Sequence, residues 1–429
     1  MSRPDTLMPA PLEAAPVPQV ANHTSWPAQY FQHVDPFDEA YHVMVCRITY
    51  SLADLEAAGE TPPTPVPCPA HAQSPLCESD RFRGAPNASS VIEESDYAPF
   101  KPRCDVLVVN AQACSPEGRP RTRWQVGFGF GEAIHKVFQV CGPRRLKKGL
   151  TGWQLSAPAP ATEVPLVYEL AYGGPIVLRA QQLLEQLQAG ALTPDEAAQA
   201  AGAIEALPEH DAHNPIGCGH SPEPLLHALQ PVRALLAARL GLDWPAVLEL
   251  FSGAPQIEAL DTPFTGQKAY PVIGLGPVGR WWAPRLALAG THDEAWKATQ
   301  WPRSPRDHDY RYWNCAPEDQ QIDYPAGGEV IALANLGRAQ GGTGPLRRFA
   351  LPRQDLQLLV RLEAGPMLFA PMHIDTVIID LEADTLTVVR RATVSARMPV
   401  RKLELGTWPP GTQATATQAT ATPESAHGR

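Results

Sequence analysis

The chain has 429 residues, of which 44% are hydrophobic and 19% are charged, and its formal net charge is −10. This much apolar material excludes a wholly disordered chain, and the acidic balance disfavours nucleic-acid binding, which needs a net basic face. The 47 prolines are about twice the ordinary share. Because proline lacks a backbone N–H donor, we expect short elements joined by long loops.

Neither a membrane span nor a secretion signal is apparent in the sequence. No stretch approaches the ~18 apolar residues that cross a bilayer, and the first 20 residues lack the charged-then-apolar pattern of a signal peptide. The eight cysteines are scattered without a C-x-x-C pair, which favours buried thiols over disulfides. We therefore expect a cytoplasmic protein.

The N-terminal part is predicted to be rich in β-strands. Residues 1–20 indicate a disordered arm, and residues 21–175 form the first β-rich part. Residues 42–52 predict a strand, because every second side chain is apolar and these share one face. Residues 60–78 form a proline-rich loop. Residues 106–109 predict a short buried strand.

A hairpin over residues 123–141 is the clearest local pattern. The large apolar side chains of Trp124, Val126, Phe128 and Phe130 alternate with polar residues and glycines. The triplet that begins with Gly131 can turn the chain, so that the following apolar run returns as the second strand.

The middle of the chain predicts an inserted helical segment over residues 176–252. It is rich in Ala, Leu and Gln, and Thr193 with Glu196 form a capping box. A second helical stretch, 222–251, is expected to break near Pro231 and Gly241.

Strands return in residues 253–405, the C-terminal β-rich part, at 329–336, 357–363, 375–381 and 385–395. A short helix is expected to begin at a capping box of Thr291 and Glu294. Residues 406–429 predict a disordered tail of Thr, Ala and Gln. The predicted fold class is therefore β-rich α+β, with antiparallel, sandwich-like sheets, long proline-rich loops and an inserted helical segment.

One loop carries residues that could bind a metal. His210, His213, Cys218 and His220 lie within eleven residues, and imidazole and thiolate are zinc ligands. Their spacing matches no familiar zinc motif, so a solvated histidine-rich loop is the alternative. The stretch Gly274-x-Gly276-x-x-Gly279 matches a dinucleotide fingerprint, but tryptophans and a proline follow where that motif needs a helix.

Several colinear segments between residues 20 and 400 resemble a bacterial family built on a domain of unknown function, DUF2169. They include the stretches 94–109, 165–174, 214–219 and 276–296, with shorter matches up to residue 380. The resemblance marks motif positions that either fix loop geometry or face a partner: Pro99, Lys101, Asp105, Tyr168, Glu169, Tyr172, Gly173, Gly174, Asn214, Gly217, Gly219, Arg311, Asn314 and Asp375. The chain departs from the pattern at Arg390, where a tryptophan is usual.

Members of this family accompany type VI secretion genes, so the resemblance implies a non-enzymatic adaptor or chaperone. Such a protein binds a secreted effector, or the carrier at the spike tip, and assists its loading for export. We expect no catalytic residues, no cofactor, no nucleic-acid partner and no membrane insertion. The alternative is a metal-dependent or other hydrolase that uses the histidine-rich loop. The sequence also leaves open a structural part of the secretion machine.

Overall fold

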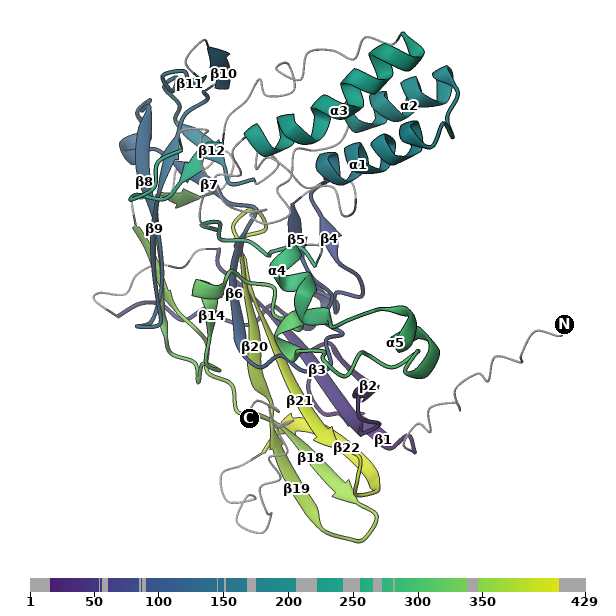
Figure 1. Cartoon of the computed structure of the whole chain (residues 1–429). Helices are drawn as coiled ribbons and strands as arrows, with labels where there is room; N and C mark the ends of the chain where they lie inside the picture. Colours follow the sequence, from purple (N-terminus) through teal and green to yellow (C-terminus); the bar gives the residue numbers. More distant parts are fainter. Residues whose placement is uncertain are drawn as a thin grey trace, which may run out of the picture.

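The fold is given by a computed structural model that describes residues 16–53, 55, 61–84, 86, 90–144, 146–149, 152–167, 175–205, 222–241, 255–264, 272–280, 282–337 and 346–408. A six-stranded sheet runs through the middle of the molecule (Figure 1). Its strands, in spatial order, are β14 (Gln321–Ile322), β6 (Cys104–Val109), β20 (His373–Asp380), β21 (Thr385–Ser395), β3 (Ala40–Ser51) and β2 (Ala28–Val34). Neighbouring strands are antiparallel except β20 and β6, which are parallel.

Further sheets surround this one. A five-stranded sheet contains β13 (Ile257–Glu258), β9 (Ile134–Cys141), β8 (Arg123–Phe130), β15 (Val330–Ala334) and β17 (Leu346–Ala350). A four-stranded sheet contains β1 (Gln19–Asn22), β22 (Val400–Thr407), β18 (Leu356–Leu362) and β19 (Met367–Pro371), of which β1 and β22 are parallel. A small three-stranded sheet contains β12 (Glu163–Pro165), β7 (Gln112–Cys114) and β16 (Leu336–Gly337). Two strand pairs complete the β-structure of the described residues. They are β10 (Leu146–Gly149) with β11 (Gly152–Leu155), and β4 (Arg81–Phe82) with β5 (Val91–Glu93). The predicted β-rich α+β class is confirmed.

Three helices gather at one end of the molecule (Figure 1): α1 (Pro175–Gln188), α2 (Pro194–Glu205) and α3 (Pro222–Leu240). Both α2 and α3 pack against α1. The predicted capping box is confirmed, because Thr193 Oγ1 donates to Glu196 Oε2 over 2.7 Å and Thr193 N donates to the same oxygen over 2.9 Å. The expected break at Pro231 is wrong. This proline lies inside α3, where burial of Val232 and Leu236 compensates for the missing hydrogen bond.

Shorter helices shape the loops between strands. They are α4 (Ala283–Leu286), α5 (Glu294–Thr299), and the 3-10 turns η1 (Ala70–Ala72), η2 (Pro116–Gly118), η4 (Ala287–Ala289), η5 (Tyr310–Trp313) and η6 (Glu318–Gln320). The capping box predicted for α5 is wrong in its residues. Asp293 is the N-cap and its Oδ1 accepts from Trp296 N over 2.8 Å. Thr291 hydrogen-bonds Asp307 instead, 2.7 Å from Thr291 Oγ1 to Asp307 Oδ2.

The hairpin and the long strands follow the sequence pattern. Strands β8 and β9 pair in register from Arg123 with Cys141 to Phe130 with Ile134. Gly131 turns the chain with φ +51°, a conformation that glycine adopts readily. The four alternating aromatic and aliphatic side chains of β8 are all buried. The predicted strand at 42–52 is β3, and its alternate residues Met44, Cys46, Ile48 and Tyr50 lie in the main core.

The six-stranded sheet is covered on both faces. On the inner face, the side chains of β3, β6, β20 and β21 join one apolar core with residues of the four- and five-stranded sheets. On the outer face, loops cover the sheet, so that even Arg47 and Thr49 of β3 are buried. A strand buried on both sides loses the simple alternation of apolar and polar burial. The family motif positions that the structure describes lie on this outer face or beside it: Pro99, Lys101, Asp105, Arg311, Asn314 and Asp375.

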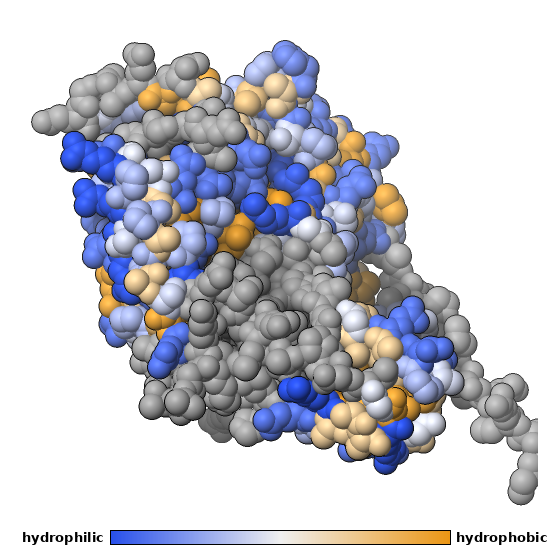
Figure 2. Space-filling model, turned by 90° about the horizontal axis from the view of Figure 1, so that it is seen from above, coloured by the Kyte–Doolittle hydropathy of each residue, from blue (hydrophilic) through white to orange (hydrophobic). Residues whose placement is uncertain are grey.

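The surface around this framework is mostly polar where it is drawn in colour. Seen from the helical end, hydrophilic residues dominate and hydrophobic ones form small separate groups (Figure 2). Strand β1 includes Gln19 and Val20 from the predicted N-terminal arm, and β22 extends to Thr407, just inside the predicted tail. Within the described residues, no helix is long and apolar enough to cross a bilayer.

Candidate functional site

A layer of buried charged side chains lies between the outer face of the six-stranded sheet and the loops that cover it. We call it the charged layer, and each of its members is less than 8% exposed. It comprises four cations and five carboxylates: Arg47, Glu93, Glu94, Asp96, Lys101, Asp105, Arg285, Asp375 and Arg391. Because charged residues are almost never fully buried unless they are paired, the pairing within this layer decides what it can do.

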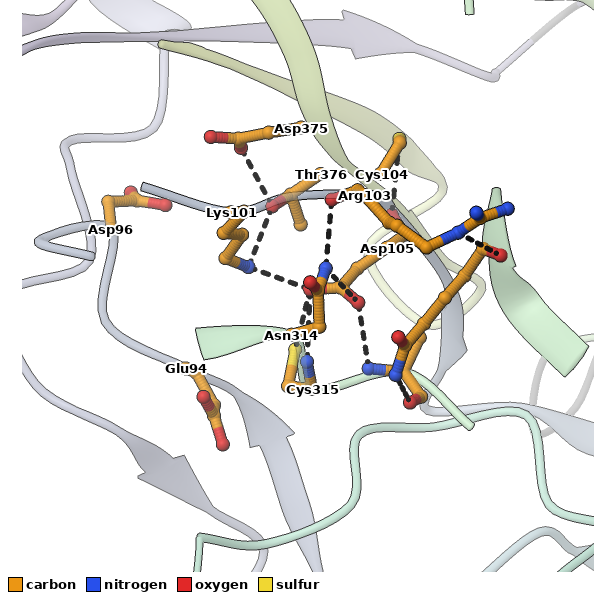
Figure 3. Close-up of polar contacts among 12 residues, drawn as sticks. Glu94, Asp96, Lys101, Arg103, Cys104, Asp105, Asn314, Cys315, Asp375 and Thr376 are labelled. Carbon is orange, nitrogen blue, oxygen red and sulfur yellow. Dashed lines mark hydrogen bonds and ion pairs between the residues drawn. The ribbon is translucent and has the colours of Figure 1, made fainter. Parts of the chain in front are cut away.

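Asp105, at the second position of β6, is the best-satisfied member of the charged layer (Figure 3). Its carboxylate accepts from Lys101 Nζ at 2.8 Å, Asn314 Nδ2 at 3.1 Å, and the backbone N–H groups of Cys315 and Ala316, each at 3.0 Å. Burial alone would raise the pKa of Asp105, but Lys101 and the backbone donors hold it below its usual value. Asp105 therefore anchors the segment after η5 to the sheet.

Lys101 joins two strands from a loop. Its ammonium group also donates to Thr376 Oγ1 of β20, 2.9 Å away, and the hydroxyl of Tyr324 donates to its backbone carbonyl. Burial lowers the pKa of Lys101, but the attraction of Asp105 outweighs this and the net shift is upward. A lysine held in its charged form by fixed partners is suited to structural pairing rather than to proton transfer.

Asp375 faces the charged layer because of a β-bulge. Ile374 pairs with Arg390 and Thr376 pairs with Val389, so Asp375 is the extra residue between them. A bulge turns a side chain away from its regular direction. Asp375 Oδ2 accepts from Arg391 Nε over 2.6 Å and Oδ1 accepts from Thr376 Oγ1 over 3.0 Å.

The arginines Arg47 and Arg285 bind the end of β5 and the loop that follows it, which carry Glu93, Glu94 and Asp96. Arg47 of β3 contacts both Glu93 and Asp96, the latter over 3.0 Å. Arg285 of α4 binds both carboxylate oxygens of Glu94, and the distance from Nη2 to Oε2 is 2.7 Å. Segments that are almost 200 residues apart in sequence are thereby held together. Removing one partner of such a pair costs about 3–5 kcal/mol, because the other charge is left buried and unpaired.

Two other motif residues fall near this layer but act differently. The backbone carbonyl of Pro99 accepts a hydrogen bond from Thr393 Oγ1 over 2.7 Å, and this bond fixes the covering loop on β21. Arg311 is 58% exposed and pairs with Asp309 over 2.6 Å, so it belongs to the surface.

The remaining predicted site residues lie outside the described residues. They are Tyr168, Glu169, Tyr172, Gly173, Gly174, His210, His213, Asn214, Gly217, Cys218, Gly219 and His220. The zinc interpretation of the histidine-rich loop therefore stays a prediction. Within the part of the chain that is described, no group of three or more His, Cys, Asp or Glu is placed to hold a metal ion.

The glycine-rich stretch at 274–279 serves as structural backbone. It is a loop rather than the start of a long helix, and its carbonyl groups accept hydrogen bonds from the protein. Lys136 Nζ donates to Gly274 O over 2.8 Å, and Gln320 Nε2 donates to Leu275 O over 3.0 Å. Because these residues form a loop, the stretch lacks the helix N-terminus that pyrophosphate binding needs.

A smaller aromatic cluster extends the outer face to the edge strand β2. His33 Nε2 lies 3.2 Å from the hydroxyl of Tyr310 in η5, and the ring of His308 meets Tyr310 edge to face. Burial lowers the pKa of His33 to about 4, although Asp35 opposes the shift. Both histidines are therefore neutral contacts at pH 7, since burial also lowers the pKa of His308.

The family motifs mark three of the nine members of the charged layer, Lys101, Asp105 and Asp375, and do not mark the arginines and carboxylates that complete it. Arg47, Arg391, Glu93 and Asp96 were not singled out. A signal is present, because Arg47 and Arg391 each stand beside apolar residues of a long strand, and a charge that is buried there requires a partner. The sequence alone could not say which acid supplies it.

The fold and the charged layer together define a β-rich protein in which the motif residues Lys101 and Asn314 both bind the motif residue Asp105 of β6. The chain belongs to the family described as an uncharacterized protein conserved in bacteria (DUF2169), whose model matches residues 38–391. Comparisons with curated proteins and with solved structures give no match.

Proposed function

We propose that this protein is a non-enzymatic adaptor or chaperone of the bacterial cytoplasm, which binds a type VI secretion effector or its spike-tip carrier and assists its loading for export. The link to type VI secretion is supported by the resemblance of the motif segments. The adaptor role is supported by what those motif residues do in the fold.

The observation that carries the proposal is the mutual pairing of motif residues. The Asp105 carboxylate accepts from Lys101 and Asn314, and the Asp375 carboxylate accepts from Arg391 and Thr376. A general acid or base needs access to the proton that it transfers, whereas these groups are buried and held by protein partners. Their pairing supports a scaffold that presents rigid loops, which is what a binding protein requires.

Co-expression tests the proposal directly. The chain is expressed with a toxin and a spike-tip carrier of a type VI secretion system from the same bacterium, and stable complexes are isolated by affinity and size-exclusion chromatography. We expect one of the two products to co-purify, and deletion of the gene to reduce export of the toxin. Absence of a complex together with unchanged export overturns the proposal.

The same preparation distinguishes the hydrolase alternative. Stoichiometric zinc in the purified protein, lost when His213→Ala is introduced, would support a metal enzyme built on the histidine-rich loop. Elemental analysis of the wild type and of this variant gives the answer without knowledge of a substrate.

A further inference from the structure

Of the eleven exposed large apolar side chains among the described residues, three lie on or beside turns at one end of the six-stranded sheet. Phe37 is 62% exposed, Met398 is 49% exposed and Trp301 is 47% exposed. Phe37 sits in the turn between β2 and β3, Met398 in the turn between β21 and β22, and Trp301 directly after α5. We call these three residues the turn patch. Isolated exposed apolar residues are ordinary, but a group at one place marks a binding surface.

Ion pairs hold the three turns of the turn patch together. Asp38, next to Phe37, pairs with Arg303, which lies two residues after Trp301. Glu39 accepts two hydrogen bonds from Arg397, each 2.7 Å long, and Arg397 precedes Met398. The N–H of Ala396 donates to the carbonyl of Ala40 over 2.8 Å, so the two strand turns also share a backbone bond. Figure 1 shows α5 beside the ends of β2 and β3.

Two of the three turns are also fixed by hydrogen bonds of their own. Asp35 Oδ1 accepts from the N–H groups of Phe37 and Glu39 at 2.8 and 2.9 Å, which fixes the turn that presents Phe37. The indole N–H of Trp296 in α5 donates to the carbonyl of Arg303 over 2.9 Å, which fixes the segment that carries Trp301. A surface with little freedom to lose binds a partner at low entropic cost.

The charges around the turn patch indicate the chemistry of its partner. Both rim carboxylates, Asp38 and Glu39, are already neutralised by arginines, so the rim offers little net attraction to a charged ligand. The exposed side chains are Trp, Phe and Met, and the rim supplies Arg. These are the residue types enriched in the centres of protein interfaces. An apolar protein segment fits this surface best.

We propose that the turn patch is the surface on which an apolar segment of the exported partner docks. This inference rests on the proposed adaptor function and adds to it the face of the molecule that makes the contact. A second copy of this chain is the competing occupant.

The test uses the full chain and the toxin or carrier that co-purifies with it, each purified separately. Binding is measured by calorimetry for the wild type, for Trp301→Ser, and for the triple variant Phe37→Ser, Trp301→Ser and Met398→Ser. The matched control is Val137→Ser, which changes a 50% exposed apolar residue of β9 outside the turn patch. We expect Trp301→Ser to weaken binding about 30-fold, as loss of a hot-spot residue does, and the control to bind like the wild type.

Each outcome bears on one claim. If the wild type binds and the triple variant binds equally well, the turn patch is not the docking surface while the adaptor function stands. If the wild type binds neither product, the proposed function and this inference both fail. A wild-type dimer in light scattering that becomes a monomer in the triple variant identifies a second copy as the occupant and overturns the inference. Thermal melting of each variant checks that it is folded.

Discussion

Arg390 and Arg391 follow one another in β21 and face opposite sides of the six-stranded sheet. Arg391 points to the outer face, where its Nε donates to Asp375 over 2.6 Å and its Nη1 donates to the carbonyl of Asp96 over 2.8 Å. Arg390 points to the inner face, opposite Cys46 in the apolar core. There its Nη1 donates to the Met372 carbonyl over 3.1 Å, and its Nε has no hydrogen-bond partner.

The surroundings of an arginine side chain therefore differ between the two faces of the sheet. On the outer face, burial of the Arg391 charge is compensated by the opposite charge of Asp375, although Arg391 Nη2 also lacks a hydrogen-bond partner. On the inner face, burial lowers the pKa of Arg390, which means that the charged form is penalised there. The comparison teaches that two equally buried arginines need not contribute equally to the stability of the fold. The predictions below test it by changing one face at a time.

The largest effect is expected on the outer face. Arg391→Met removes the cation that neutralises Asp375 and leaves a buried carboxylate without its ion pair. We expect the free energy of unfolding to fall by about 3–5 kcal/mol, measured by urea denaturation. A loss below 1 kcal/mol would contradict the view that the charged layer holds the covering loops.

The edge of the outer face should make stability depend on pH. The pKa of His33 is about 4 in the fold and about 6.5 when unfolded, so the unfolded chain binds more protons between these values. Stability is therefore fully present above pH 6.5 and is lost as the pH falls toward 4. We expect about 2 kcal/mol less stability at pH 5 than at pH 7 from this residue. His33→Gln should flatten the dependence, and an unchanged slope in this variant would refute the assignment.

The inner face should respond in the opposite direction. Arg390→Met replaces a poorly compensated buried cation with an apolar side chain of similar length, so we expect stability to stay the same or to rise by about 1 kcal/mol. The comparison with Arg391→Met uses the same substitution on neighbouring residues, which makes each the control of the other. A loss of more than 2 kcal/mol would show that Arg390 has a stabilising partner.

The smallest effect is expected at the surface of the loops. Arg311→Ala breaks an ion pair with Asp309 whose arginine is 58% exposed. Water and salt screen such a pair, so we expect stability to change by less than about 1 kcal/mol. Urea midpoints at low and high salt check this, and a loss as large as that of Arg391→Met would place Arg311 in the charged layer after all.

Much of the fold could be predicted from patterns that are local in sequence. The hairpin of β8 and β9, the long strand β3, and the Thr193 capping box follow from alternation and from cap chemistry within a few residues. Strand β2 was not predicted, because its seven residues do not alternate clearly and it owes its order to pairing with β3. Pro231 misled the prediction of α3, because packing within the helical segment outweighed a local rule.

The candidate site was harder to predict, because its partners are distant in sequence. Lys101 and Asp105 lie four residues apart and could be noticed together, but Asn314 and Asp375 reach them only through the sheet and the loop after η5. The bulge that turns Asp375 depends on the pairing of β20 with β21. Such contacts are set by tertiary structure, so a sequence can mark the residues without stating which ones meet.

The pairing of β3 with β21 also sets the order in which this protein can be made. Ser51 lies beside Thr385, so a ribosome adds more than 300 residues after β3 before its central neighbour exists. At about 5–20 residues per second, this delay is roughly 20–70 seconds. During that time, the edge of β3 that later pairs with β21 has unpaired backbone N–H and C=O groups. Unpaired strand edges of this kind are prone to aggregate. The long separation of β3 from β21 in sequence therefore makes the time of synthesis the period in which this chain is most exposed to aggregation.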